Sequence, residues 1–168
     1  MRVDYIKVEG YPQPKERSGV GIYGNLYKKK RTREYEDKIN DAMGLYLGAD
    51  VYRGIIYVDL ICIFSRTKEL MKRYKDGRFK YGTTRLAHLV KPDHDNVRKS
   101  VLDGMQGYMD GGDCRVIGGL TMKYYGGIIN DECESEKVII RVITETNLEE
   151  LHDFISDGST MKELLSIH

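Results

Sequence analysis

The chain has 168 residues, of which 40% are hydrophobic and 32% charged, the length and balance of one globular domain. No apolar run approaches the roughly 18 residues that a membrane span needs, and no charged-then-apolar N-terminal segment suggests a secretory signal. Cys62, Cys114 and Cys133 are widely separated and lack zinc-ligand spacing, which indicates reduced thiols. We therefore expect a soluble, cytoplasmic protein with no membrane partner.

The net charge of +1 conceals a strong asymmetry along the chain. Residues 1–100 hold 22 Lys and Arg against 13 Asp and Glu, whereas residues 101–168 hold 5 against 13. The first part thus carries +9 and the second −8. This distribution predicts a basic surface suited to a polyanion.

The first half of the chain alternates between apolar and breaker-rich segments. Alternating apolar residues predict a strand over 2–8, and two prolines with basic neighbours keep 12–17 extended. The glycine-rich stretch 19–24 continues as a loop that could drape over a ligand. Helical spacing from Thr32, a plausible cap, to Tyr46 predicts a helix of about four turns. Residues 54–64, apolar on both faces, predict the central strand.

In the second half, apolar spacing after Pro92 predicts a helix that starts near Asp95 or Asn96 and ends within 107–112. Residues 116–125 and 137–144 predict two strands, which we interpret as an antiparallel pair. Asn147 is predicted to cap a C-terminal helix, and residues 161–167 are expected to form a final short turn. The predicted fold is a single α+β domain over 1–168: a small mixed or antiparallel sheet packed with two main helices, and a helical tail over 147–168.

Residues 66–91 are unusually basic, with nine Lys and Arg against two acidic residues. Residues 67–76 are consistent with a short helix that stops at Gly77, followed by a loop or hairpin. Tyr74, Phe79 and Tyr81 are interleaved with the cations and could stack on bases. A solvated surface is the alternative, but the stretch leads directly into an acidic motif, which favours nucleic-acid binding.

The acidic motif comprises Asp93, Asp95 and, further on, Asp103 and Asp113. On a helix, Asp95, Lys99 and Asp103 form one stripe that holds the lysine between two carboxylates. Clustered carboxylates repel each other unless a cation joins them, and an all-oxygen set selects a hard ion such as Mg²⁺ or Mn²⁺. Such an ion activates water and neutralises charge on a phosphoryl group, a charge that Lys99 could also stabilise.

A purely structural interpretation of the same residues stays open. Asp95 could cap the helix, Asp93 could favour its positive end, and Lys99 with Asp103 could form a surface pair. An EF-hand is excluded, because Arg98 stands at its sixth position, where a glycine is required. We place His94 outside the ligand set, because a residue between two acids on an extended segment points away from them.

The sequence Lys-Pro-Asp-His-Asp-Asn-Val-Arg-Lys at 91–99, with Ser-Val-Leu-Asp at 100–103 and Asp-Cys-Arg-Val at 113–116, resembles the RusA family of Holliday junction resolvases. The basic segments 12–17 and 26–35 are also similar to that family, so the resemblance spans about residues 3–144. It implies a small homodimeric α+β endonuclease that nicks a four-way DNA junction symmetrically with magnesium.

Carried over position by position, the resemblance makes Asp93, Asp95 and Asp113 the metal-binding catalytic acids and Lys99 the catalytic lysine. Asp103 matches a further acidic position. The family often has two adjacent acids where this chain has Gly112 and Asp113, and a shifted alignment would place Cys114 at the third acid. We favour Asp113, because a thiolate suits a hard ion poorly.

The sequence therefore predicts a Mg²⁺-dependent endodeoxyribonuclease, with Mn²⁺ as a possible substitute, that resolves four-way junctions in DNA recombination and repair. The alternatives are a non-catalytic nucleic-acid-binding protein and a nuclease for flaps or other branched DNA. A two-fold homodimer is expected, through either the helix at 97–108 or the C-terminal helix. The predicted DNA-binding residues are Lys15, Arg17, Lys72, Arg73, Lys75, Arg78, Lys80, Arg85, Lys91 and Arg98.

Overall fold

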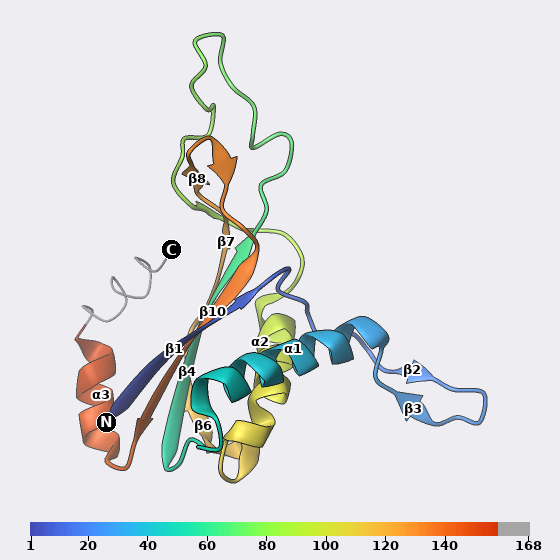
Figure 1. Cartoon of the computed structure of the whole chain (residues 1–168), viewed down its shortest axis with the longest axis vertical. Coiled ribbons are helices and arrows are strands. Elements are labelled where there is room, and N and C mark those ends of the chain that lie inside the picture. The colour runs from blue at the N-terminus through green and yellow to red at the C-terminus, as the bar shows by residue number, and fades with distance from the viewer. Residues whose placement is uncertain (158–168) are drawn as a thin grey trace.

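The computed structural model describes residues 1–157, and its elements follow the hydrophobic patterning of the sequence (Figure 1). No helix within this range is both long and apolar enough to cross a membrane. The elements are β1 (Arg2–Glu9), β2 (Gly19–Val20), β3 (Leu26–Tyr27), α1 (Lys30–Leu47), β4 (Ile55–Phe64), β5 (Leu86–Ala87), α2 (His94–Met105), the 3₁₀ helices η1 (Gln106–Tyr108) and η2 (Gly112–Arg115), β6 (Val116–Gly118), β7 (Thr121–Tyr125), β8 (Ile128–Ile129), β9 (Glu132–Cys133), β10 (Lys137–Glu145) and α3 (Leu148–Ser156).

A six-stranded mixed sheet forms the centre of this single α+β domain, with strand order β1-β10-β4-β7-β5 and β6 paired to β4. β10 is antiparallel to both β1 and β4, whereas β6 and β7 run parallel to β4. The prediction of β4 as the central strand is confirmed, since nearly all of its side chains are buried. Long apolar strands covered on both faces are typical of such central positions.

α1 and α2 cover one face of the sheet, and α3 lies on the other side in Figure 1. Ile39 and Met43 of α1 and Val101 and Met105 of α2 are completely buried against β4 and β10. The two helices approach closely at Gly104, where an added Cβ would lie 2.8 Å from both the Glu36 carbonyl oxygen and Ile39. This apolar layer fixes the direction of α2 over the sheet.

The predicted antiparallel pairing of residues 116–125 with 137–144 is wrong. The first segment breaks into β6 and β7, and β10 inserts between β1 and β4 instead. The turn-forming residues between the two segments instead form a local hairpin, in which Asn130 and Asp131 adopt positive φ angles between β8 and β9. Two consecutive positive φ angles suit such a two-residue hairpin.

Three smaller predictions also need correction. No helix forms over 67–76, where hydrogen-bonded turns lead to an isolated bridge between Arg73 and Phe79. The predicted loop at 19–24 contains β2. α1 begins at Lys30, so Thr32 is no cap, and its hydroxyl instead accepts a hydrogen bond from the Glu16 amide at 3.3 Å. The strand at 2–8, the helices α1 and α2, and the Asn147 cap of α3 are confirmed. The predicted turn at 161–167 lies outside the described residues.

Candidate active site

Asp93 and Asp95 lie at the N-terminal end of α2 and are both exposed. Asp93 occupies the N-cap position, but its side chain makes no capping hydrogen bond, and Asp95 belongs to the first helical turn. Capping therefore does not account for either carboxylate. The Lys99 ammonium lies 3.6 Å from Asp95, one turn further along the same face. Two carboxylates and a lysine thus share one exposed helix end.

Two basic side chains hold this end of α2 on the sheet. Lys123 of β7 donates hydrogen bonds to the carbonyl oxygens of Val90 and Pro92, both at 2.6 Å. Arg98 donates to the carbonyl oxygens of Val58 at 2.8 Å and Gly118 at 2.9 Å. Burial lowers the pKa of the Arg98 guanidinium from its ordinary value. Arg98 therefore anchors the helix, and its polar groups are engaged inside the protein rather than presented to DNA.

Lys123 was not among the predicted site residues. The available signal was a single lysine within the otherwise uncharged strand sequence Thr-Met-Lys-Tyr-Tyr. Such a residue on a partly buried strand requires carbonyl or carboxylate partners. Its two acceptors, Val90 and Pro92, lie within the three residues before Asp93, so Lys123 positions the entry to the acidic motif.

The N-terminal basic segment contacts the same helix. The Lys15 amide donates to the Asn96 carbonyl oxygen at 2.8 Å, and the Lys15 ammonium pairs with the Asp103 carboxylate. The predicted stripe, with Lys99 between Asp95 and Asp103, is thus formed only in part: Lys99 pairs with Asp95, and Asp103 pairs with Lys15. Segments far apart in sequence nevertheless meet at α2.

Asp113 lies on η2, which the chain reaches only after passing through the whole of α2 and η1. Within residues 1–157, no three His, Cys, Asp or Glu side chains form a group that could hold a metal ion. The structure therefore does not gather Asp93, Asp95 and Asp113 into one ligand set. The donor chemistry of Asp93 and Asp95 still suits a hard cation, because Mg²⁺ commonly uses one or two carboxylates and completes its shell with water and substrate phosphates.

The basic protrusion, residues 66–85, extends from the end of β4 beyond the sheet (Figure 1). Its two terminal arginines point inward. Arg66 is buried and donates to the carbonyl oxygens of Gly126 and Gly82, both at 2.8 Å. Arg85 forms two hydrogen bonds with the Glu134 carboxylate, at 2.8 and 2.6 Å. These arginines secure the base of the protrusion, so Arg85, like Arg98, is engaged within the fold.

The cations between these two anchors face solvent. Three of them form exposed ion pairs, namely Lys72 with Glu69, Arg73 with Asp131 and Arg78 with Asp76. Exposed pairs contribute about 0–1 kcal/mol each, so a polyanion could replace the carboxylate partners at little cost. Tyr74 and Tyr81 are also exposed, whereas Phe79 lies beneath the Arg73 guanidinium at 3.8 Å. The outward-facing predicted cations of the protrusion are Lys72, Arg73, Lys75, Arg78 and Lys80.

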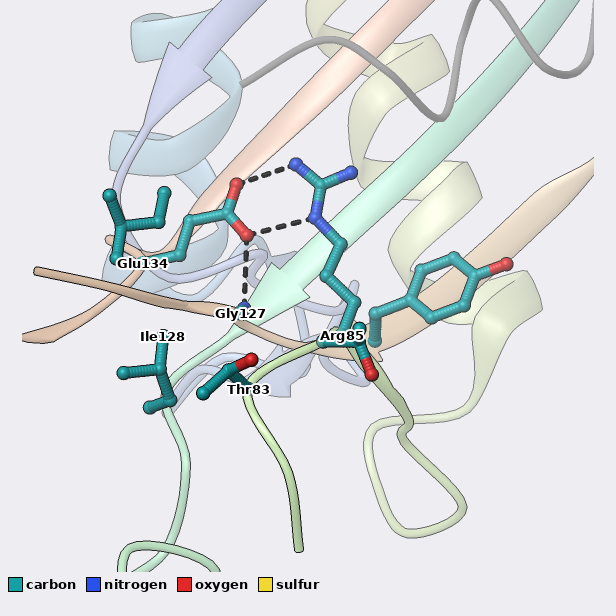
Figure 2. Close-up of a pocket in the computed structure, with 8 residues that line it drawn as sticks. Thr83, Arg85, Gly127, Ile128 and Glu134 are labelled. Atoms are coloured by element: carbon teal, nitrogen blue, oxygen red, sulfur yellow. Dashed lines mark hydrogen bonds and ion pairs between the residues drawn. The ribbon is translucent and has the colours of Figure 1, made fainter. Parts of the chain in front are cut away.

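A cavity of about 410 Å³ lies beside the base of the protrusion (Figure 2). The Arg85–Glu134 ion pair forms part of its lining, and the Gly127 amide also donates to Glu134 at 3.2 Å. Burial alone would raise the pKa of Glu134, but hydrogen bonds from Arg85 and Lys137 outweigh it and lower the pKa to about 2. None of the candidate acids lines this cavity.

A protein-family model described as "Endodeoxyribonuclease RusA" matches residues 9–131. The matched range extends from the end of β1 to the hairpin of β8 and β9, and it contains all four acids of the motif together with Lys99. A search of curated proteins found no match to the chain.

Proposed function

Because the chain belongs to the RusA family of endodeoxyribonucleases, we propose that it cleaves four-way DNA junctions by symmetric nicking during recombination and repair. The family implies endonuclease activity on Holliday junctions and hence binding of junction DNA. The observation that carries the proposal is the exposed pair Asp93 and Asp95 at the start of α2, with Lys99 beside it and the Lys15 segment attached to the same helix.

We assign Asp93 and Asp95 to the binding of Mg²⁺, with Mn²⁺ as a substitute, and Asp113 to the third acid by family resemblance. When bound, the ion supplies neutralisation of phosphate charge and activation of water. Asp93 and Asp95 stand at the positive end of α2, which stabilises both carboxylates in their charged form. Charged carboxylates are the protein ligands that Mg²⁺ uses. Contribution of Asp113 requires η2 to approach the start of α2 when substrate and metal are present.

Lys99 acts on the substrate in this proposal. Its side chain is largely exposed and only 3.6 Å from Asp95, so its ammonium lies within reach of a phosphate bound at that carboxylate. A fixed positive charge at this point stabilises the negative charge that develops on the phosphoryl oxygens or on the leaving oxygen.

DNA contacts are assigned to exposed cations in two places. The first group comprises the exposed residues Lys15, Arg17 and Lys91. Lys15 contacts α2 through its amide, Arg17 follows it in the same segment, and Lys91 lies shortly before α2 in the sequence. The outward-facing cations of the protrusion form the second group. Arg85 and Arg98 are left out of this set, because their guanidinium groups bind Glu134 and backbone carbonyl oxygens. Asp103 is assigned to holding Lys15.

A two-fold homodimer completes the proposal, because symmetric cleavage of a junction needs two equivalent sites and the chain carries one acidic motif. Such a protein acts on DNA in the cytoplasm, and no membrane partner is proposed.

The decisive experiment incubates the full chain with labelled four-way junction, flap and duplex DNA, in Mg²⁺, in Mn²⁺ and in chelator. The proposal expects paired cuts in the junction only with metal. Preferential cutting of flaps would indicate a nuclease for other branched DNA. Tight junction binding without any cleavage in either metal would indicate a non-catalytic binding protein.

A further inference from the structure

Residues 18–28, here called the arm, extend away from the body of the protein at the N-terminal end of α1 (Figure 1, light blue). β2 and β3 form its two short strands. Its tip is apolar and almost fully exposed: the relative exposure is 99% for Ile22 and 94% for Tyr23. Val20, Leu26 and Tyr27 of the arm are exposed as well. Burial of apolar surface is the main driving force of association, so an exposed apolar set of this kind marks an interaction site.

The arm has a defined shape. The Gly21 amide donates to the Asn25 carbonyl oxygen at 2.8 Å, and the Gly24 amide donates to the Gly21 carbonyl oxygen at 2.9 Å. The Tyr27 ring lies against Gly19, where any added Cβ would come within 2.3 Å of it. The side chains at the tip are therefore held away from the body by a closed hairpin.

Ion pairs fix the arm at both ends. Lys15, three residues before the arm, pairs with Asp103 of α2, and Lys28, the last residue of the arm, pairs with Glu36 of α1 at 2.5 Å. Burial raises the pKa of the Glu36 carboxyl, and the negative charge of Asp103 raises it further. The arm is thus attached to the helix that carries Asp93 and Asp95. A ligand seated on the tip would be held in a fixed relation to those acids.

The charges around the arm identify the class of partner. Arg17 precedes it, and a run of exposed cations begins at its last residue, Lys28, and continues to Arg31, with Arg33 two residues further on. An apolar tip between cations matches a ligand with a polyanionic backbone and flat apolar faces, which is the chemistry of nucleic acid. A second copy of the protein would bring the same positive charges to this surface, and the two sets of charges would repel each other.

We propose that the arm enters the open centre of a branched DNA, where Tyr23 stacks on an exposed base and Ile22 packs against the neighbouring step. Apolar wedges of this kind hold base steps apart while flanking cations bind phosphates. The inference rests on the proposed function for the nature of the substrate. It adds a residue-level account of how a branch point is distinguished from continuous duplex, in which no unstacked base is available.

The experiment uses four-way junctions that carry 2-aminopurine at one branch-point position at a time. Its fluorescence rises at a base that loses its stacking neighbours to Ile22, and it stays quenched at a base that stacks on Tyr23, so a rise is sought at the step next to the stacked base. The full chain is titrated in chelator, and the double variant Ile22→Ala/Tyr23→Ala is compared with Tyr23→Phe. Leu45→Ala, which truncates an equally exposed side chain near the other end of α1, is the matched control. We expect a fluorescence rise with the wild type, with Tyr23→Phe and with Leu45→Ala. For the double variant we expect at least about fivefold weaker junction binding and a much smaller rise.

Three results would overturn the inference: no rise with the wild type, an unchanged rise with the double variant, or conversion of a dimer to a monomer by the double variant without DNA. The last result would place the arm between subunits. Cleavage is measured separately in Mg²⁺. If the wild type opens the junction without cutting it, the proposed function is contradicted and the inference about the arm is supported. If the wild type and the double variant open and cut the junction equally, only the inference about the arm is contradicted.

Discussion

Asp93 and Asp95 face solvent at the N-terminal end of α2, and no capping hydrogen bond uses the Asp93 carboxylate. Their replacement should therefore affect chemistry rather than folding. We predict that Asp93→Asn and Asp95→Asn each reduce junction cleavage by at least about 100-fold, since the loss of an outer-shell metal partner alone costs about 10–100-fold. Junction binding should stay equal or become tighter, because a negative charge is removed beside the phosphates. Cleavage and band-shift assays measure the two effects, and lost binding would contradict the assignment.

Asp113 provides the sharper test, because its position on η2 separates it from the other acids. Asp113→Asn should abolish cleavage if η2 moves to the metal in the complex. The neighbouring variants Cys114→Ser and Asp110→Asn serve as controls. Full activity of Asp113→Asn together with inactivity of either control would show that another residue is the third acid.

Glu134 illustrates how a buried carboxylate contributes to stability. Hydrogen bonds from Arg85 and Lys137 hold its pKa at about 2, below the ordinary value of 4.5. A carboxyl whose pKa is lower in the folded state stabilises the protein fully above about pH 4.5, and this contribution is lost as the pH falls toward 2. Glu134→Gln should lower the free energy of unfolding by about 3 kcal/mol at neutral pH, since it removes the carboxylate charge that pairs with the buried Lys137 and the partly buried Arg85.

Urea unfolding at several pH values between 7 and 3 tests this prediction. The difference between wild type and Glu134→Gln should shrink as the solution becomes more acidic. Glu132→Gln, on the same hairpin but exposed, should leave stability nearly unchanged at every pH. If the difference in free energy of unfolding between wild type and Glu134→Gln did not change with pH, protonation of Glu134 would not be coupled to stability.

At the scale of elements, periodicity predicted β1, β4, α1, α2 and α3, because each presents apolar side chains to the interior. It could not predict that β10 lies between β1 and β4, since an apolar strand specifies burial but not its neighbours. The helix expected over 67–76 failed for a physical reason. Its side chains are mostly exposed, and little apolar surface is buried to stabilise the helix.

The same limit applies to the site. The pair Asp93 and Asp95 could be found from spacing, because a local motif places both on one helix end. Arg85 and Arg98 look like DNA-binding cations in the sequence, but their partners, Glu134 and the Val58 carbonyl oxygen, are distant in the chain. Only the tertiary structure separates cations that anchor the fold from those that face solvent.

Gly119 connects β6 to β7 and illustrates a backbone requirement. Its φ is +136°, and an added Cβ would lie 1.6 Å from the Val58 carbonyl oxygen, the group that also accepts a hydrogen bond from Arg98. We predict that Gly119→Ala destabilises the protein by at least about 2 kcal/mol and displaces the start of α2, lowering cleavage as well.

Gly48→Ala is the matched control for that variant. Gly48 also has a positive φ, at the end of α1, but nothing lies within 4 Å of the position of its Cβ. It should cost only about 1 kcal/mol and leave cleavage intact at temperatures where both proteins are folded. Thermal unfolding and initial cleavage rates separate the two effects. Equal behaviour of the two variants would show that the contact with Val58 has no importance.

The protrusion should supply affinity rather than chemistry. Lys72→Gln/Arg73→Gln removes two exposed cations, so we predict weaker binding to every DNA sequence and a slope of log affinity against log salt that is reduced by about 2. Cleavage at saturating protein should be unchanged. Arg85→Gln is an unsuitable substitute, because it would disturb the base of the protrusion. Fluorescence anisotropy across a salt series measures the slope, and an unchanged slope would remove these residues from the interface.

At the scale of the whole molecule, the fold narrows the choice of dimer surface. Val101 and Met105, considered as an apolar surface from the sequence, are completely buried against α1 and the sheet, so that suggestion is wrong. Leu102 is only partly buried but packs against the same core. A dimer must therefore use other surfaces than the apolar face of α2.

The homodimer itself can be tested through its chemistry. If each subunit carries one acidic motif, a hybrid of wild type and Asp95→Asn has one working site, and it should nick only one strand of a cruciform plasmid, giving open circles. The wild-type dimer cuts two opposed strands within one binding event and gives linear plasmid. Differently tagged subunits allow the hybrid to be purified, and light scattering across a dilution series establishes its mass. Linear product from the hybrid at the wild-type rate would mean that one motif cuts both strands, which contradicts a mechanism based on two symmetric sites.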